Sequence, residues 1–205
     1  MRSGEGWRVR RPALSWGTPL LVGRLSSVLY DVHRRFPLAP AIWVHDISRR
    51  GGGPLRLHRS HRDGRDVDIR LPQRVRAGYV DATPRTLDVE RTWTLVRSLV
   101  ATCDVEFIML DFDLQRVLHR HATRGGVSRE ALALVLQYPR RIHHRHPDAS
   151  VVRHYPGHRN HMHVRFRREG EPLSFASARA LCSTRPGSTA LIHTLASPRP
   201  RSRGF

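Results

Sequence analysis

Two short segments of the chain, 66–71 and 161–166, alternate strictly between polar and apolar residues. This alternation predicts two β-strands with one polar and one buried face, because successive side chains of a strand point to opposite faces. The polar faces carry carboxylates, histidines and arginines: Asp66, Asp68 and Arg70 in the first segment, and His161, His163 and Arg165 in the second. If the two strands are neighbours in one sheet, Asp68 and His163 point toward a common groove.

These segments can assemble a set of two histidines and one carboxylate. His61 lies ahead of the first strand, in a glycine-containing turn, and can reach the groove that Asp68 and His163 face. Such a set is a standard ligand group for a catalytic zinc ion that keeps one position open for water. The pattern therefore predicts a zinc hydrolase that binds one Zn²⁺ ion.

The chain up to about residue 170 predicts helices interleaved with strands. Thr18 and Pro19 are typical of an N-cap and a first helical residue, and apolar residues at helical spacing follow as far as Val32. The later predicted elements are a strand over 41–47, a helix over 87–102, a strand over 105–110, a helix around 114–118 that stops near Gly125, and a helix from Ser128 to about Tyr138. The predicted fold class is α+β: a small single domain with a central, mainly antiparallel sheet that carries the zinc ligands and has helices packed around it.

Several segments, taken in order, also resemble a known family. They are Ser60–Ile69, with its His-x6-Asp spacing, and Gly157–Phe166, supported by Trp16–Pro19, Asp46–Ser48 and Gly51–Pro54. They are similar to the penicillin-insensitive murein endopeptidases, which belong to a wider group of metallopeptidases that includes lysostaphin, the D-Ala-D-Ala carboxypeptidases and the Sonic hedgehog fold. The resemblance covers roughly residues 7 to 168.

This resemblance implies specific site residues and a substrate. By it, the zinc ligands are His61, Asp68 and His163, the catalytic histidine is His161, and His58 and His158 are extra active-site histidines. The implied substrate is a peptide cross-link of peptidoglycan, with the amide between D-alanine and diaminopimelate of the stem peptides as the expected bond. The implied compartment is the periplasm or the cell envelope. A carboxypeptidase, or a hydrolase of another stem-peptide bond, is the alternative within the family.

The residues themselves indicate how proton transfer would be arranged. The chain contains no His-Glu-x-x-His helix, so a glutamate base of that kind is absent. His161 lies two residues before His163 on the same strand face and is the best candidate for the general acid–base. His158 could share this role or bind the developing oxyanion. Asp66 is either a carboxylate that orients a ligand histidine or a surface aspartate, and the sequence favours neither.

The remaining histidines, among 14 in the chain, are weaker candidates. The run 143–146 holds three of them but shows no alternation, so it predicts a solvated basic loop. His119 and His121 fall in an amphipathic helix and are predicted as surface or edge residues. His45, in a strand-like run, and His154, just ahead of the second polar strand, are candidates to line the groove.

The charge of the chain bears on two alternatives. The formal net charge is +19, and all 36 basic residues are arginine, which predicts a salt-sensitive attraction to polyanions such as wall polymers. A metal-dependent nuclease or nucleic-acid-binding protein is disfavoured, because the arginines do not form one stripe and aromatic residues, at 7%, are not interleaved with them. A catalytically silent zinc-bound domain that binds wall polymer or a partner is the other alternative, against which the presence of His161 argues.

The ends of the chain and its two cysteines complete the prediction. Residues 7–182 are predicted as the metallopeptidase domain and 183–205, rich in Pro, Ser and Arg, as a disordered tail. Neither a signal peptide within 1–12 nor a transmembrane segment is predicted. Cys103 and Cys182 either pair in an oxidising compartment or are free thiols, and free thiols are favoured because Cys103 is predicted to be buried. The oligomeric state is not predictable from the sequence.

Overall fold

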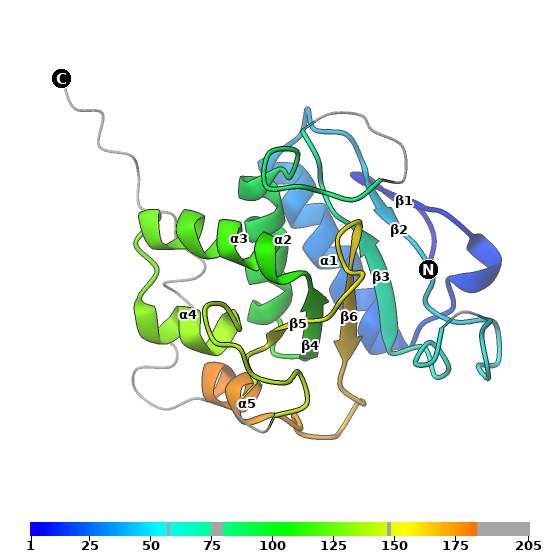
Figure 1. Ribbon diagram of the computed structural model, residues 1–205. Helices are drawn as coiled ribbons and strands as arrows, with labels where there is room; N and C mark the ends of the chain where they lie inside the picture. Colours follow the sequence, from blue (N-terminus) through cyan, green and yellow to red (C-terminus); the bar gives the residue numbers. More distant parts are fainter. Residues whose placement is uncertain (57, 75–79, 147–148, 184–205) are drawn as a thin grey trace.

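A six-stranded mixed sheet forms the centre of the domain. The computed structural model describes residues 1–56, 58–74, 80–146 and 149–183, and Figure 1 shows their arrangement. In sheet order the strands are β1 (Trp7–Val9), β2 (Ile42–Val44), β3 (Asp66–Arg70), β6 (His161–Phe166), β4 (Val105–Leu110) and β5 (Val152–His154). The pairs β2–β3, β3–β6 and β4–β6 are antiparallel, whereas β1–β2 and β4–β5 are parallel. The predicted α+β class with a mainly antiparallel sheet is confirmed.

The two strands predicted from polar–apolar alternation are neighbours. In the β3–β6 pair, Asp68 lies opposite His163 and Arg70 lies opposite His161. Paired residues share a face of the sheet, so these polar side chains belong to one face. The apolar side chains on the other face of the pair are fully buried: Val67, Ile69, Met162 and Val164. Burial of this face holds the register, since a slip by one residue would exchange the two faces.

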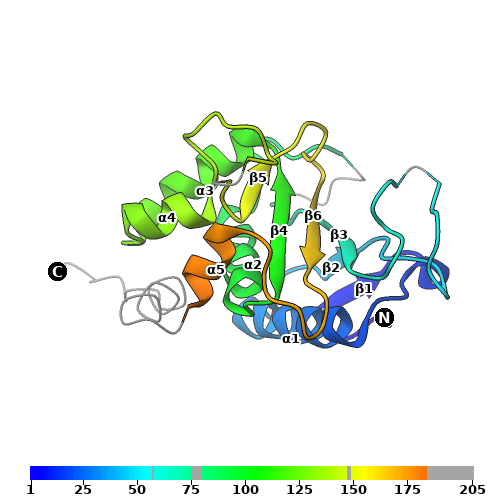
Figure 2. The same ribbon diagram turned by 90° about the horizontal axis from the view of Figure 1, so that it is seen from below.

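Five α-helices and one short 3₁₀ helix (Pro12–Leu14) surround the sheet within the described residues. The α-helices are α1 (Pro19–Arg35), α2 (Val89–Ala101), α3 (Phe112–Arg124), α4 (Arg129–Val135) and α5 (Ala176–Cys182). Figure 1 shows α1 and α2 behind the sheet, and Figure 2 shows α3 and α4 beside its β5 edge. None of the described helices is long and apolar enough to cross a membrane.

Helix α1 begins where the sequence predicts it. The Thr18 hydroxyl accepts a hydrogen bond from the backbone N–H of Leu21, at 3.2 Å, and Pro19 is the first helical residue. Its buried side chains recur at helical spacing: Leu21, Leu25, Val28, Leu29 and Val32. The capping residue and the apolar stripe therefore specify both the start of this helix and the face that packs on the sheet.

Several elements differ from their predicted bounds for identifiable reasons. The predicted strand over 41–47 is shorter and ends at Val44. The backbone of 45–46 still bonds to Asp68, but the Ile47 N–H bonds to the Leu14 carbonyl oxygen instead of the sheet. The helix predicted to run to Tyr138 ends at Val135, because Gln137 N–H bonds to the Val152 carbonyl of β5. Strands β1 and β5 and helix α5 are not predicted; the two strands are only three residues long, too short for a periodic pattern.

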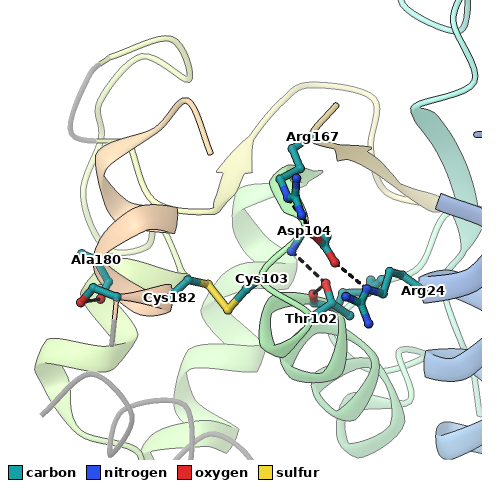
Figure 3. The surroundings of a disulfide bond; sticks show 9 residues. Arg24, Thr102, Cys103, Asp104, Arg167, Ala180 and Cys182 are labelled. Atoms are coloured by element: carbon teal, nitrogen blue, oxygen red, sulfur yellow. Dashed lines mark hydrogen bonds and ion pairs between the residues drawn. A yellow bond between two sulfur atoms is a disulfide. The ribbon is translucent and has the colours of Figure 1, made fainter. Parts of the chain in front are cut away.

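The two cysteines form a disulfide, so the preference for free thiols is wrong. Cys103 lies in the turn between α2 and β4, and Cys182 is the last residue of α5, as Figure 3 shows. Their Cα atoms are 5.6 Å apart, which is the usual span of a disulfide. The error arises because α5, which the sequence does not predict, brings Cys182 to a Cys103 that is only partly buried. The tail predicted over 183–205 lies, from residue 184 on, outside the described residues.

Candidate metal centre and active site

Three side-chain atoms converge on one point of the polar sheet face. His163 Nδ1 lies 3.0 Å from Asp68 Oδ1, His61 Nε2 lies 3.2 Å from His163 Nδ1, and His61 Nε2 lies 3.3 Å from Asp68 Oδ1. Atoms bound tetrahedrally to zinc at about 2.0–2.1 Å stand about 3.3 Å from one another. The spacing and the chemistry of this trio therefore fit a tetrahedral metal ion.

Both histidines of the trio are held by a second hydrogen bond. The His61 Nδ1–H donates to the Ile47 carbonyl oxygen at 3.0 Å, which leaves Nε2 available to a metal ion. The His163 Nε2–H donates to Asp66 Oδ1 at 3.0 Å, which leaves Nδ1 available. Asp66 is fully buried and also accepts from Arg165 at 3.2 Å. Of the two roles that the sequence left open for Asp66, the geometry supports orientation of a ligand histidine.

His58 stands beside the same centre. His58, His61 and Asp68 each bring one ligand atom to within 4.8 Å of the others, so these three side chains could also hold a metal ion. The His58 Nδ1 lies 3.6 Å from Asp68 Oδ2, and its Nε2 lies 3.1 Å from Asp46 Oδ2. The distances among His61, Asp68 and His163 are shorter, and His58 is partly committed to Asp46. The trio of His61, Asp68 and His163 is therefore the tighter of the two candidate sets, and His58 borders it.

His161 lies next to the trio with an unprotonated ring nitrogen facing it. Its Nε2 is 3.8 Å from Asp68 Oδ1, and its Nδ1–H donates to Asn160 Oδ1 at 2.6 Å. This hydrogen bond places the lone pair on Nε2, the nitrogen that faces the centre. Burial, partly opposed by Asp68, lowers the pKa of His161 to about 4. The imidazole is therefore neutral near pH 7.

His158 packs against His161 at the rim of the centre. The two ring centroids are 4.7 Å apart, and the His158 Nδ1–H donates to the Pro156 carbonyl oxygen at 3.2 Å. Burial lowers the pKa of His158, partly opposed by that hydrogen bond. The structure thus brings all the predicted site residues into one cluster: His58, His61, Asp66, Asp68, His158, His161 and His163.

The electrostatics of the trio favour a bound cation. Burial alone raises the pKa of Asp68, but hydrogen bonds from His163 and His61 outweigh it and hold the pKa well below its usual value. Burial opposes protonation of His163, but hydrogen bonds to Asp66 and Asp68 outweigh it and raise its pKa to about 9. Without a metal ion, His163 therefore carries a proton that balances the buried carboxylates. A metal ion held by Nδ1 would replace that positive charge.

Of the weaker histidine candidates, some lie beside the centre and others lie elsewhere. His45 is buried just after the end of β2, and its backbone N–H donates to the Asp68 carbonyl oxygen at 2.8 Å. His154 instead accepts from the Phe112 N–H at 3.1 Å, at the start of α3. The run 143–146 forms a loop as predicted, although the His144 ring also contacts Tyr155, at 5.0 Å between centroids.

Three residues that support the centre are not predicted from the sequence. Asp46 is buried and bonds to His58, and the Arg11 Nε–H donates to it at 2.9 Å. Asn160 orients His161, and the Phe107 ring stacks on His163 with centroids 6.2 Å apart. Asp46 and Asn160 lie within segments that carried the family resemblance, which was a usable signal. Phe107 lies in an apolar run that indicated only a buried strand.

The chain matches one protein-family model. The family model described as penicillin-insensitive murein endopeptidase matches residues 1–174, which include every side chain of the cluster. No curated protein matches the chain in sequence. The match supports a peptidoglycan hydrolase activity. With most of its length covered by this family model, the chain belongs to the penicillin-insensitive murein endopeptidase family.

Proposed function

We propose that this protein is a zinc-dependent endopeptidase that hydrolyses peptide cross-links of peptidoglycan in the cell envelope. One Zn²⁺ ion is held by His61 Nε2, Asp68 Oδ1 and His163 Nδ1. The observation that carries this proposal is the convergence of these three atoms at 3.0–3.3 Å, together with the family match over residues 1–174. The bond proposed for cleavage is the amide between D-alanine and diaminopimelate.

The donor set suits hydrolysis of an amide. Two neutral imidazoles and one carboxylate would leave a bound zinc ion with net positive charge, and the ion would supply a Lewis acid for activating water and polarising the amide carbonyl. His61 and His163 are kept in the required tautomers by Ile47 and Asp66. The chain therefore contributes a preorganised site, which limits the reorganisation needed during the reaction.

His161 is proposed to move the protons. Its Nε2 faces the centre with a free lone pair, so it can accept the proton of the attacking water and then deliver a proton to the leaving amine. Asn160 keeps the ring in this orientation. His158 packs against His161 at the rim, and because its Nδ1–H donates to the Pro156 carbonyl oxygen, its Nε2 carries a lone pair and could share the proton-transfer role.

The first experiment is mass spectrometry of cross-linked muropeptide dimers incubated with the purified protein, with and without a chelator. Conversion to monomers that the chelator abolishes and added zinc restores is expected, and fragment masses identify the bond. Intact dimers, in a sample shown to carry one zinc per chain, would contradict the proposal. That result would favour the catalytically silent domain that binds wall polymer.

A further inference from the structure

A pocket of about 310 Å³ lies near the candidate metal centre but does not include its ligands. Its walls combine three arginines, Arg8, Arg70 and Arg91, with the side chains of Trp43, Gln73 and several apolar residues at the ends of β2 and β3. Trp43 is 40% exposed and offers an open aromatic surface. A pocket with this much positive charge and an aromatic wall is typical of a site for an anionic organic ligand.

The register of the sheet connects the pocket to the active site. Arg8 is paired with Trp43 across β1 and β2, and the register of β2 against β3 sets Trp43 opposite Arg70. Arg70 in turn is paired with His161 on β6. Paired residues share a face, so these four side chains form a row across four strands on the face of the metal centre. With strands about 4.8 Å apart, the pocket extends from about 5 to about 14 Å away from His161.

Arg91 supplies the strongest sign that the pocket expects an anion. Its side chain is buried, only 4% exposed, yet its Nε has no hydrogen-bond partner among the described residues. Its Nη2 donates to the Pro40 carbonyl oxygen at 2.5 Å, a neutral acceptor that does not balance the charge. A buried cation of this kind costs free energy unless a counter-charge accompanies it. Burial also lowers the pKa of Arg91, opposed by the negative charge of Asp88.

Arg8 adds a second guanidinium with neutral acceptors. Its Nη1 donates to the carbonyl oxygens of Gly4 and Trp7, both at 3.0 Å. Guanidinium groups bind carboxylates through paired N–H donors, and such charge-assisted bonds are stronger than bonds to neutral carbonyls. A carboxylate entering the pocket would therefore gain charged partners on β1 and α2.

We propose that this pocket binds a free carboxylate of the peptidoglycan stem peptide while the scissile amide lies beside His161. The inference rests on the proposed function for the identity of the ligand. Stem peptides carry carboxylates on their acidic residues and at their ends. An extended peptide advances about 3.3 Å per residue, so a span of about 5–14 Å corresponds to a carboxylate roughly two to four residues from the cleaved bond. The pocket would then select the register in which the substrate binds.

The test measures binding of two probes to the full-length protein by calorimetry at fixed ionic strength. One probe is the soluble stem tetrapeptide with free carboxylates, and the other is its fully amidated form. Wild-type protein is expected to bind the acid at least about tenfold more tightly than the amide. Arg91→Gln and, separately, Arg8→Gln should each remove most of the preference for the acid over the amide. Arg97→Gln, on the same helix as Arg91 but outside the pocket lining, is the matched control and should keep it.

Each outcome decides the proposal. Equal affinity for acid and amide, or no detectable binding of the acid at millimolar concentration, overturns it. An equal loss in Arg97→Gln would assign the preference to the overall positive charge and would also overturn it. If Arg91→Gln does not fold, Arg8→Gln, whose guanidinium is less buried, carries the test. Because binding is measured without turnover, an acid preference in a protein that cleaves no muropeptide would retain the pocket and reject the proposed function.

Discussion

Asp68 is the residue on which the proposed metal site depends most. Its Oδ1 lies within 3.3 Å of ligand nitrogens on both His61 and His163. Asp68→Ala is expected to reduce bound zinc from about one per chain to near zero, as measured by elemental analysis. Asp63→Ala removes a half-exposed carboxylate that pairs with Arg65 and should keep the metal. Full zinc occupancy in Asp68→Ala would refute the ligand set.

His161 should separate metal binding from turnover. Because its Nε2 lies 3.8 Å from Asp68 and is not one of the converging atoms, His161→Ala is expected to keep zinc. Loss of the proton-transfer group should lower kcat by about 10²–10⁴-fold, measured on muropeptide dimers. His119→Ala, on α3, serves as the control. Activity equal to wild type in the His161 variant would remove that residue from the mechanism.

Zinc affinity should depend on pH through His163. Hydrogen bonds to Asp66 and Asp68 raise its pKa to about 9 in the metal-free protein, against the effect of burial. Below that pH, a zinc ion must displace a proton from Nδ1 before it binds. The apparent affinity should therefore rise about tenfold per pH unit from pH 7 toward 9 and then level off.

A competition titration against a chromophoric chelator of known pH dependence would measure this effect. Asp66→Asn removes one of the two carboxylates that raise the pKa of His163. The zinc affinity of this variant should therefore stop rising, and reach its plateau, at a lower pH than that of the wild-type protein. The same change loosens the orientation of the ligand, so zinc affinity at pH 9 should fall by about 10–100-fold. A pH-independent affinity in the wild-type protein would contradict the proposed protonation of His163.

At the scale of elements, the pairing of β3 with β6 builds the centre. Each strand contributes one of the proposed ligands, and the pair is continuous with β2 on one side and β4 on the other. The third proposed ligand, His61, comes from a turn whose backbone bonds to two other segments. The Gly53 N–H donates to the Arg62 carbonyl oxygen, and the Thr18 N–H donates to the Gly64 carbonyl oxygen. Gly64 has φ +74, and a Cβ there would lie 3.1–3.2 Å from the backbone of 17–18. Glycine is therefore required where this loop packs against the start of α1.

The disulfide fastens α5 to the turn that follows α2. Figure 3 shows it beside Asp104, whose carboxylate is bound by Arg24 and Arg167. Because the bridge closes a loop across a sequence separation of 79, its removal by Cys103→Ser with Cys182→Ser should lower the free energy of unfolding by about 2–4 kcal/mol.

Denaturant unfolding, with and without a reductant, would measure that loss. The reductant should destabilise the wild-type protein by a similar amount and leave the double variant unchanged. Zinc content should be the same in both proteins, since neither cysteine contacts the metal centre. A wild-type protein that is indifferent to the reductant would contradict the pairing.

The whole molecule carries a large positive charge, and its consequence is salt dependence. The formal net charge is +19, and the wall polymer is anionic, so long-range attraction should assist binding at low ionic strength. Binding to isolated wall sacculi, measured by co-sedimentation, is expected to weaken several-fold between 50 and 500 mM NaCl. Cleavage of small soluble dimers should depend less on salt. Salt-independent binding to sacculi would show that the arginine excess does not act in recognition.

Local pattern was sufficient to predict the elements with strong periodicity. Helix α1 with its cap, strand β4 and the polar strands around Asp68 and His163 follow from side-chain spacing and capping chemistry. Elements β1 and β5 could not be predicted, because three residues do not form a pattern. They exist because backbone groups of β2 and β4 offer hydrogen bonds to them. Helix α5 and the disulfide it carries likewise depend on contacts distant in the chain.

By itself, the sequence determined which side chains can form a metal centre, because the alternation of β3 and β6 selects the face that each residue occupies. Tertiary structure alone decided how that centre is supported. The buried partner of His163 is Asp66, and the partner of His58 is Asp46. Arg91 of α2 lines the same pocket as residues of the strands β1, β2 and β3. Alternation along a strand is a local property of the backbone. Burial and distance between segments arise only when the chain has packed, so no local pattern records them.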